Sequence, residues 1–189
     1  MTTQPQRSIY QIKISLIGAK PPIWRRVLVP DDIDLGAFHE VIQVAMGWTN
    51  SHLHQFIADR VFYSAPDPYD DFDLEAEDET LYQLFQLLTK EKDSITYEYD
   101  FGDGWKHKIL LEKILPFDDK TVLPVCIKGK RACPPKDCGG IWGYEALLVT
   151  ITDPKHPDYK DMLEWLGGQF DPDKFDLADT NVGLAEYCR

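Results

Sequence analysis

Hydrophobic and polar residues alternate along several stretches of the chain. In residues 10–16 every second position is apolar, which is the two-residue period of a strand with one buried face. Residues 18–22 contain a glycine and two prolines and predict a turn before a second strand at 23–29. These two strands are expected to form a hairpin. Two more strands are predicted at 52–58 and 61–64, on either side of a turn.

A helical period marks other stretches. The clearest helix is expected after a cap at Asp32 or Asp34 and is closed by Gly47, with apolar side chains at Leu35, Phe38, Val41, Ile42 and Ala45. Shorter helices are predicted near 81–88, 144–152 and 159–166, and a last short helix near the end of the chain. Between Pro116 and Gly140 the pattern is irregular, and no regular element is expected there.

The stretch 95–115 allows a residue-by-residue prediction. Gly102-Asp103-Gly104 is a turn signal between two alternating runs. A three-residue loop would place Tyr99 opposite His107 on an aromatic face and Asp100 opposite Lys106 on a charged face. A shift of one residue would mix the two faces, so this register is preferred.

The order of these elements indicates the fold class. Strands come first and helices cluster late, which is typical of an α+β protein rather than of a doubly wound sheet. We expect an antiparallel or mixed β-sheet built from hairpins and packed against several helices on one side. No domain boundary is visible, so residues 1–189 are predicted to form a single domain.

Charge narrows the choice of partners. The chain has 189 residues and a net charge of −12, from 20 basic and 32 acidic residues. This excess of acid argues against nucleic acid as a partner, because phosphate binding needs Lys and Arg. The distribution is uneven, however. Residues 1–30 and 120–136 each hold five basic residues and no acidic one, whereas 67–79 holds eight acidic residues and is predicted to be a solvated loop.

The chain shows no membrane or secretion signal. Its first eight residues are polar, and no apolar run reaches the length of a membrane span. We therefore expect a cytoplasmic protein without a membrane partner. In that compartment the four cysteines are expected to be reduced, so metal binding or simple packing is favoured over disulfides.

One segment has the spacing of a chelating pair. Cys133 and Cys138 are separated by four residues, and such a loop can turn both thiolates toward one zinc ion, although a packed, metal-free loop is the competing interpretation. Zinc is accordingly the cofactor that the sequence suggests. The neighbouring Lys128, Lys130 and Arg131 form either an anion-binding site or a solvated basic loop.

Polar residues in two other segments form a second candidate site. His52 and His54 would share one face of a strand, and His107 lies on the predicted aromatic face with Asp100 and Asp103 nearby. Imidazole and carboxylate groups in one cluster can bind a metal or act as acid and base. The alternative is a hydrogen-bonded histidine network that packs among aromatic side chains.

Three segments together resemble a known family. They are His-Leu-His-Gln-Phe at 52–56, Tyr-Asp-Phe-Gly-Asp-Gly-Trp-Lys-His at 99–107 and Cys-Pro-Pro-Lys-Asp-Cys-Gly-Gly at 133–140. The chain resembles the plasmid pRiA4b open reading frame three family from about residue 10 to residue 181. The resemblance implies a compact α+β domain linked to plasmid or mobile-element biology, and it implies no assigned activity.

Three functional hypotheses follow. The sequence lacks the nucleotide-binding, zincin and nucleophile-elbow motifs, so a non-catalytic module that binds a protein or a small molecule comes first. A metal-dependent, hydrolase-like enzyme that uses the His/Asp cluster comes second. Nucleic-acid binding through the local basic patches comes third. Whether the protein is an enzyme stays open at this point.

Overall fold

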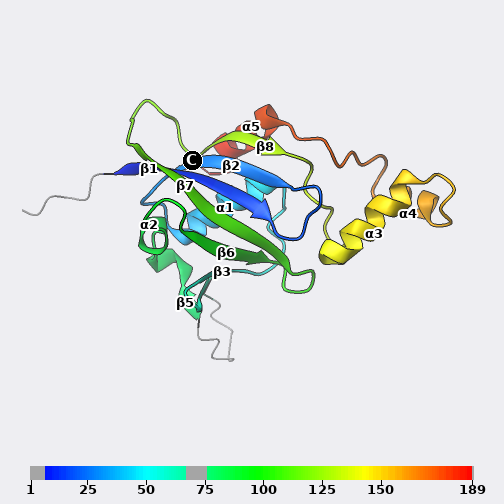
Figure 1. Ribbon diagram of the computed structural model, residues 1–189, viewed down its shortest axis with the longest axis horizontal. Coiled ribbons are helices and arrows are strands. Elements are labelled where there is room, and N and C mark those ends of the chain that lie inside the picture. The colour runs from blue at the N-terminus through cyan, green and yellow to red at the C-terminus, as the bar shows by residue number, and fades with distance from the viewer. Residues whose placement is uncertain (1–6, 67–75, 189) are drawn as a thin grey trace, which may run out of the picture.

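The computed structural model describes residues 7–66 and 76–188. It contains one eight-stranded sheet in the order β5-β4-β3-β6-β7-β1-β2-β8, in which all neighbours are antiparallel except β4 and β5 (Figure 1). The strands are β1 (Ser8–Leu16), β2 (Trp24–Pro30), β3 (His54–Ala58), β4 (Val61–Ser64), β5 (Ala76–Asp78), β6 (Ser94–Tyr99), β7 (Trp105–Pro116) and β8 (Val125–Lys130).

The helices are α1 (Leu35–Met46), the 3₁₀ helix η1 (Glu79–Leu81), α2 (Leu84–Leu87), α3 (Gly140–Thr152), α4 (Tyr159–Trp165) and α5 (Leu177–Tyr187). A mixed sheet combined with these helices confirms the predicted α+β class. None of the helices in the described ranges combines the length and apolar character that crossing a bilayer requires.

The long helix α1 forms where the apolar spacing predicts it. Asp34 caps its first turn by accepting a hydrogen bond from the Ala37 N–H at 2.8 Å, and Gly47 ends it with a φ of 100°. On the apolar side of the helix, Phe38 stacks on Phe56 of β3, with ring centroids 6.0 Å apart. Helix α5 packs against α1 and β8, so both helices lie on the same side of the sheet.

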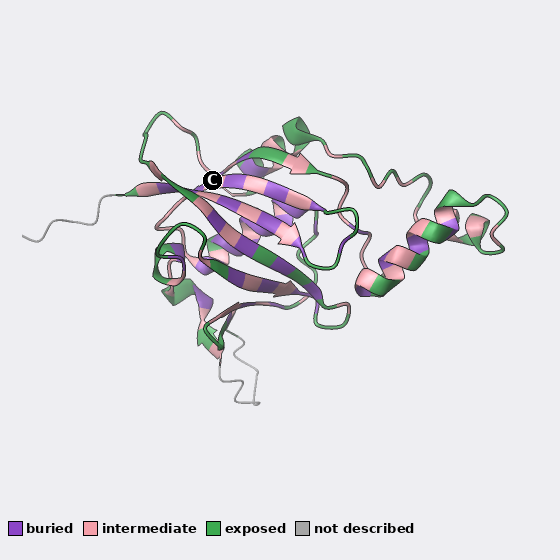
Figure 2. Ribbon diagram, viewed as in Figure 1, coloured by how far each residue is buried: buried purple, intermediate pink, exposed green. Residues whose placement is uncertain are grey.

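The sheet has one buried face and one open face. Along β1, β2, β6 and β7 buried residues alternate with more exposed ones (Figure 2). The buried positions include Ile12, Val27, Tyr97 and Ile109, which are fully buried. They pack with the side chains of α1 in one core. This alternation is the physical basis of the strand predictions.

The β6–β7 hairpin has a longer loop than predicted. Tyr99 lies opposite Trp105 and Tyr97 opposite His107, so the pairing is shifted by two residues and the loop spans residues 100–104. A shift of two keeps every side chain on its predicted face, because the side-chain period of a strand is also two. The alternation therefore determines the faces but not the register, and it releases Asp100 from the strand into the turn.

Three local predictions were wrong. Strand β8 lies inside the segment that was expected to be irregular, and strand β3 begins at His54 rather than at residue 52. Residues 76–79 of the acidic loop expected at 67–79 form β5 and the start of η1, whereas residues 67–75 lie outside the described residues. Short strands such as β5 and β8 are stabilised by their neighbours in the sheet, which local patterns do not record.

Helices α3 and α4 extend away from the sheet as a separate arm (Figure 1). They contact each other, and the arm is joined to the sheet through the segment that carries Cys133 and Cys138. We call α3 and α4 the helical arm below. Its base lies near the β6–β7 turn, because the backbone at Gly140 closely approaches the Asp103 carbonyl.

Candidate metal site at the junction of three loops

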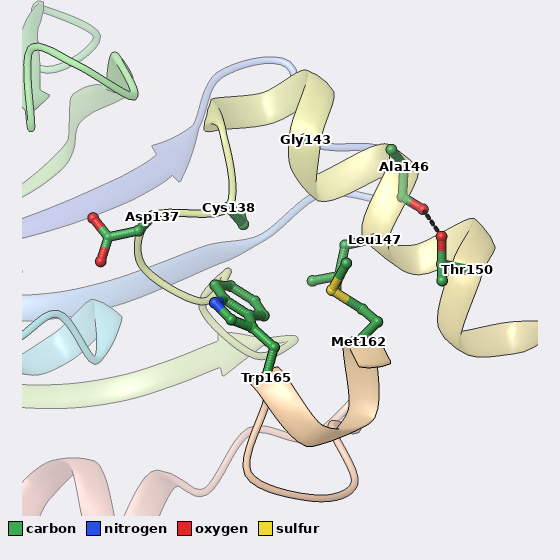
Figure 3. Close-up of a pocket in the computed structure, with 8 residues that line it drawn as sticks. All are labelled: Asp137, Cys138, Gly143, Ala146, Leu147, Thr150, Met162 and Trp165. Atoms are coloured by element: carbon green, nitrogen blue, oxygen red, sulfur yellow. Dashed lines mark hydrogen bonds between the residues drawn. The ribbon is translucent and has the colours of Figure 1, made fainter. Parts of the chain in front are cut away.

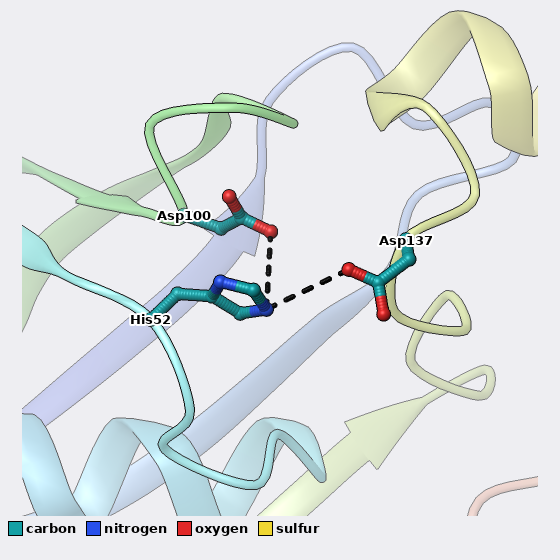
Figure 4. Close-up of side chains that lie close together, drawn as sticks. All are labelled: His52, Asp100 and Asp137. Atoms are coloured by element: carbon teal, nitrogen blue, oxygen red, sulfur yellow. Dashed lines mark ion pairs between the residues drawn. The ribbon is translucent and has the colours of Figure 1, made fainter.

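Side chains from three separate loops meet at one end of the sheet (Figure 4). His52 precedes β3, Asp100 begins the β6–β7 turn, and Asp137 lies between the two cysteines of the segment before α3. His52 Nε2 is 3.6 Å from Asp100 Oδ2 and 3.6 Å from Asp137 Oδ1. Within the described ranges this is the one group of three histidine, cysteine or acidic side chains whose ligand atoms all lie within 4.8 Å of one another.

The turn after β6 fixes the Asp100 carboxylate. Asp100 has a φ of 57°, and its Oδ1 accepts hydrogen bonds from the N–H groups of Gly102 at 3.0 Å and Asp103 at 3.3 Å. Aspartate tolerates this left-handed conformation because its short side chain can bond to the local backbone. With Oδ1 used by the turn, Oδ2 is the atom that faces His52.

The loop before β3 is tied to the other two. The Ser51 N–H donates to the Tyr99 hydroxyl at 3.0 Å, and Lys136 Nζ donates to Ser51 Oγ at 3.1 Å. The His52 ring meets Tyr99 edge-on, with centroids 5.9 Å apart. These contacts orient His52 from behind, as partners outside the ligand set commonly do at metal sites.

Two of the three ligand separations match those around a bound ion, and the oxygens of Asp100 and Asp137 lie within 4.8 Å of each other. A separation of 3.6 Å is too long for a hydrogen bond. Two ligands about 2.0–2.2 Å from a tetrahedral zinc ion are themselves separated by roughly 3.3–3.6 Å. One imidazole and two carboxylates are a donor set that suits zinc or manganese. Three protein ligands leave at least one coordination position for water or a substrate.

His54 lies outside this group. Its Nε2 is 2.8 Å from Glu79 Oε2, both side chains are buried, and its ring stacks on His39 with centroids 3.4 Å apart. His39 in turn bonds to Tyr97 and Asn50 through its two ring nitrogens. Burial, followed by the nearby His54, lowers the pKa of His39 to about 4. This arrangement is the buried histidine network that the sequence analysis named as the alternative.

His107 lies in the core beneath the site. It is fully buried against Trp48 and Tyr97, and burial lowers its pKa to about 4. The backbones of Tyr97 and Trp105 are near the ring, but neither ring nitrogen makes a hydrogen bond of normal geometry with a described residue. Such a neutral, enclosed imidazole packs as an aromatic side chain.

Asp103 lies beside the cluster without joining it. Its Oδ2 is buried and has no hydrogen-bond partner among the described residues. Of the five polar residues proposed from the sequence, the structure therefore brings together His52 and Asp100 and places the other three elsewhere.

The two cysteines of the neighbouring segment, Cys133 and Cys138, form no disulfide in the structure. Burial raises the pKa of Cys133, and burial together with the Asp103 charge raises the pKa of Cys138 to about 12. Both thiols are therefore protonated at neutral pH in the absence of a metal. The three-ligand group described above contains neither of them.

The basic residues proposed as an anion site diverge. Lys128 and Lys130 are exposed on β8, whereas Arg131 forms an ion pair with Asp173. The two lysines lie on the open face of the sheet, because Lys128 is opposite Arg26 and Lys130 is opposite Trp24. They form a surface with other strand residues rather than a pocket.

A cavity of about 320 Å³ lies on the other side of the loop that carries Asp137 (Figure 3). Its wall is mostly apolar and includes Leu147, Met162 and Trp165 of the helical arm. Asp137 lines this cavity through its backbone side, and its carboxylate points away from it, toward His52. The cavity and the His/Asp cluster therefore lie on opposite sides of the loop that carries Asp137.

Asp137 is the functional candidate that the sequence analysis did not single out. It lies 85 positions after His52 in the chain. Its φ of 57° depends on the conformation of the loop, which spacing does not reveal. The signal in the sequence is its position between Cys133 and Cys138, in a segment whose thiols are the more obvious metal ligands.

Comparison with known proteins extends the family resemblance. Residues 8–179 match the family model described as plasmid pRiA4b ORF-3-like protein. The uncharacterized protein y4hQ of Sinorhizobium fredii (strain NBRC 101917 / NGR234) is 39% identical over 175 residues, which covers 92% of this chain and 87% of that protein. The crystal structure of MM3350, a protein of unknown function from Methanosarcina mazei Go1, is similar at a TM-score of 0.81 and 36% identity, with 92% of this chain and 97% of that chain covered. The chain therefore belongs to the plasmid pRiA4b ORF-3-like family.

Proposed function

We propose that this protein is a metal-dependent, hydrolase-like enzyme that binds a divalent metal ion through His52, Asp100 and Asp137. The observation that carries the proposal is the pair of 3.6 Å separations from His52 Nε2 to the two carboxylate oxygens. These distances are too long for hydrogen bonds and match the spacing of ligands around one ion. Zinc is the metal that we expect.

The exposure of the three ligands supports a reactive rather than a structural site. The side chain of Asp100 is 11% exposed, that of His52 33% and that of Asp137 65%. Structural zinc sites are closed by four protein ligands, whereas catalytic sites keep a position for water. A zinc ion held in this way would lower the pKa of its bound water to about 7 and so supply a hydroxide at neutral pH.

The protein residues have separable roles in this proposal. Asp100 is the anchored ligand, because the turn holds one of its oxygens. Asp137 is the most exposed ligand and lies on a loop, so it is the one that a substrate can most easily displace or approach. Tyr99 and Ser51 hold the His52 loop and are positioning residues.

Zinc titration by calorimetry tests the metal site. Asp137→Asn and His52→Ala should each weaken zinc binding by at least about tenfold, because each removes one of three ligands. The matched controls are Asp161→Asn, an exposed carboxylate on α4, and His156→Ala, whose side chain is 31% exposed compared with 33% for His52. Both controls should bind zinc as the unaltered protein does. Equal loss in all four variants, or no zinc binding at all, would contradict the proposal.

Turnover tests the catalytic part. Ester, phosphoester and peptide substrates should be hydrolysed by zinc- or manganese-loaded protein, and a chelator should abolish the activity until metal is restored. Asp137→Asn should lose most of this activity. Metal binding without turnover of any substrate class would retain the metal site and reject the enzyme.

An exposed aromatic residue on the helical arm favours a second candidate, a non-catalytic interaction module. Trp142 is 80% exposed and Val149, two helical turns later on the same side of α3, is 64% exposed. Exposed apolar side chains of this kind often mark a protein contact. The family description names a plasmid, so such a partner would belong to plasmid or mobile-element biology. Capture experiments with Trp142→Ala as the negative control test this alternative.

A further inference from the structure

The open face of the sheet concentrates positive charge on an acidic protein. Strand pairing places Arg26 of β2 opposite Lys13 of β1 on one side and opposite Lys128 of β8 on the other. In the next row Trp24 lies between Ser15 and Lys130, and Ser15 is opposite Lys108. Directly opposed residues share a face. We call this surface the cationic face; its basic residues are Lys13, Arg26, Lys106, Lys108, Lys128 and Lys130.

Few acidic groups oppose these charges. At the described strand positions of β6, β7, β1, β2 and β8 on this face, the carboxylates are Glu98 and Glu112, and each is already paired, with Lys106 and Arg26 respectively. Lys13, Lys108, Lys128 and Lys130 form no ion pair with any described residue. They remain available to an external anion, although the whole chain carries a net charge of −12.

An aromatic ring lies within the cationic face. Trp24 is partly exposed, and Lys13 Nζ and Arg26 Cζ lie 5.1 Å and 5.3 Å from its ring centroid. A shallow hollow of about 570 Å³ lies on the same face, and polar as well as apolar side chains line it, among them Arg26, Glu112, Leu110 and Ile127. The face therefore offers several cations and one aromatic ring, beside a hollow of mixed polarity.

We propose that single-stranded nucleic acid binds across the cationic face, with phosphates on its lysines and a base on Trp24. Sheets that bind single strands combine these same elements, since cations track the backbone and aromatic rings stack on bases. Duplex DNA fits less well, because its major groove is entered by a helix or a ribbon, and this face is a broad sheet.

The proposal is independent of the metal site, and fluorescence anisotropy with a labelled oligothymidine of about 20 nucleotides tests it in the presence of a chelator. Binding should be measurable at about 50 mM salt and should weaken steeply as salt rises, since each neutralised phosphate of a single strand contributes about −0.7 to the log–log slope. Lys128→Glu/Lys130→Glu should weaken binding at least about tenfold and reduce the slope by about 1.4. Trp24→Leu should weaken it at least about fivefold.

Lys155→Glu/Lys160→Glu is the matched control. It gives the chain the same net charge as the β8 variant, but it alters exposed lysines on and beside the helical arm. This control should bind the oligonucleotide within about twofold of the unaltered protein, because nonspecific binding follows local rather than total charge. Equal weakening in both double variants would overturn the proposal.

Two further probes decide which polyanion uses the face. A duplex of the same length and vesicles containing phosphatidylserine should both bind more weakly than the single strand. Stronger binding to the duplex or to the vesicles would overturn the assignment to single strands, as would the absence of oligonucleotide binding at low salt. Unchanged thermal unfolding of the β8 variant would show that its loss of binding is not a loss of fold.

Discussion

Asp100 and Asp137 both have a φ of 57°, a conformation in which a side chain crowds the backbone. Strained residues of this kind persist where the surrounding structure holds them, and they gather at functional sites. Both residues direct a carboxylate toward the His52 imidazole (Figure 4). A third position with a constrained backbone is Gly140, where the chain passes close to the β6–β7 turn.

Gly140 should be essential for the geometry of the site. It has a φ of 68°, and a Cβ at this position would overlap the Asp103 carbonyl oxygen. Gly140→Ala should therefore push the Asp137 loop away from Asp100 and weaken zinc binding at least about tenfold. Calorimetric zinc titration measures this.

Gly167→Ala is the comparison for that variant. Gly167 has a nearly equal φ of 70°, but a Cβ there would meet nothing within 4 Å. It carries the same backbone penalty, about 1 kcal/mol, without the collision. If both variants kept full zinc affinity, the close approach at Gly140 would have no role in the site.

At the scale of elements, β8 shows how this sheet protects an edge. Edge strands expose unpaired backbone groups that can pair with other chains. Asn181 of α5 covers part of this edge: the Cys126 N–H donates to Asn181 Oδ1 at 2.8 Å, and Asn181 Nδ2 donates to the Cys126 carbonyl at 2.9 Å. One amide side chain thus takes the place of a neighbouring strand and joins α5 to the sheet.

Removal of this amide should loosen α5. Asn181→Ala is expected to lower the free energy of unfolding by about 2 kcal/mol, since two hydrogen bonds to partly buried backbone groups are lost. Asn181→Asp keeps the acceptor but places a carboxylate oxygen against the Cys126 carbonyl, so it should destabilise the protein at least as much. Urea unfolding measures both, and amide exchange at Cys126 should accelerate in the alanine variant. Unchanged exchange there would contradict the role assigned to Asn181.

The elements also show which kinds of information the sequence holds. The period of two predicted β1, β2, β6 and β7, and the helical period with its caps predicted α1, because in each case one face is buried. The register of β6 and β7 was wrong by two residues because such a shift leaves every face unchanged. The strand β8 was missed because its pairing with β2 and its cover by Asn181 involve residues distant in the chain.

The candidate site was predictable in part for the same reason. His52 and Asp100 lie in conspicuous local motifs and were named from them. Their convergence with Asp137 depends on three loops that meet only in the folded chain, and the same folding separates His54 and His107 from them. Local spacing identifies the residue types that can perform chemistry, whereas tertiary structure selects which of them meet.

At the scale of the whole molecule, two buried histidines make the fold sensitive to acid. His39 and His107 have folded-state pKa values of about 4, below the ordinary value of 6.5. The unfolded chain therefore takes up protons between these values while the folded chain does not. Stability is complete above about pH 6.5, falls as the pH decreases toward 4, and loses no more from these groups below that.

Equilibrium unfolding at pH 7 and pH 5 tests this dependence. Each buried histidine should cost about 2 kcal/mol at pH 5, so the unaltered protein should lose about 4 kcal/mol between the two values from this source. His107→Leu should lose about half as much, because one neutral imidazole has been replaced by an apolar side chain. His156→Leu, which alters a partly exposed histidine, should behave as the unaltered protein does. Identical pH dependence in both variants would show that His107 does not titrate in this way.

The helical arm gives the three-loop junction a consequence beyond chemistry. Asp137 lies only three residues before α3, whereas His52 and Asp100 lie in loops that directly adjoin strands β3 and β6 of the sheet. An ion that links these side chains would clamp the base of the arm, and its departure would leave the arm held by fewer contacts. The direction in which Trp142 faces a partner would then depend on whether the site holds an ion. One bound ion would in this way fix the orientation of the helical arm relative to the sheet.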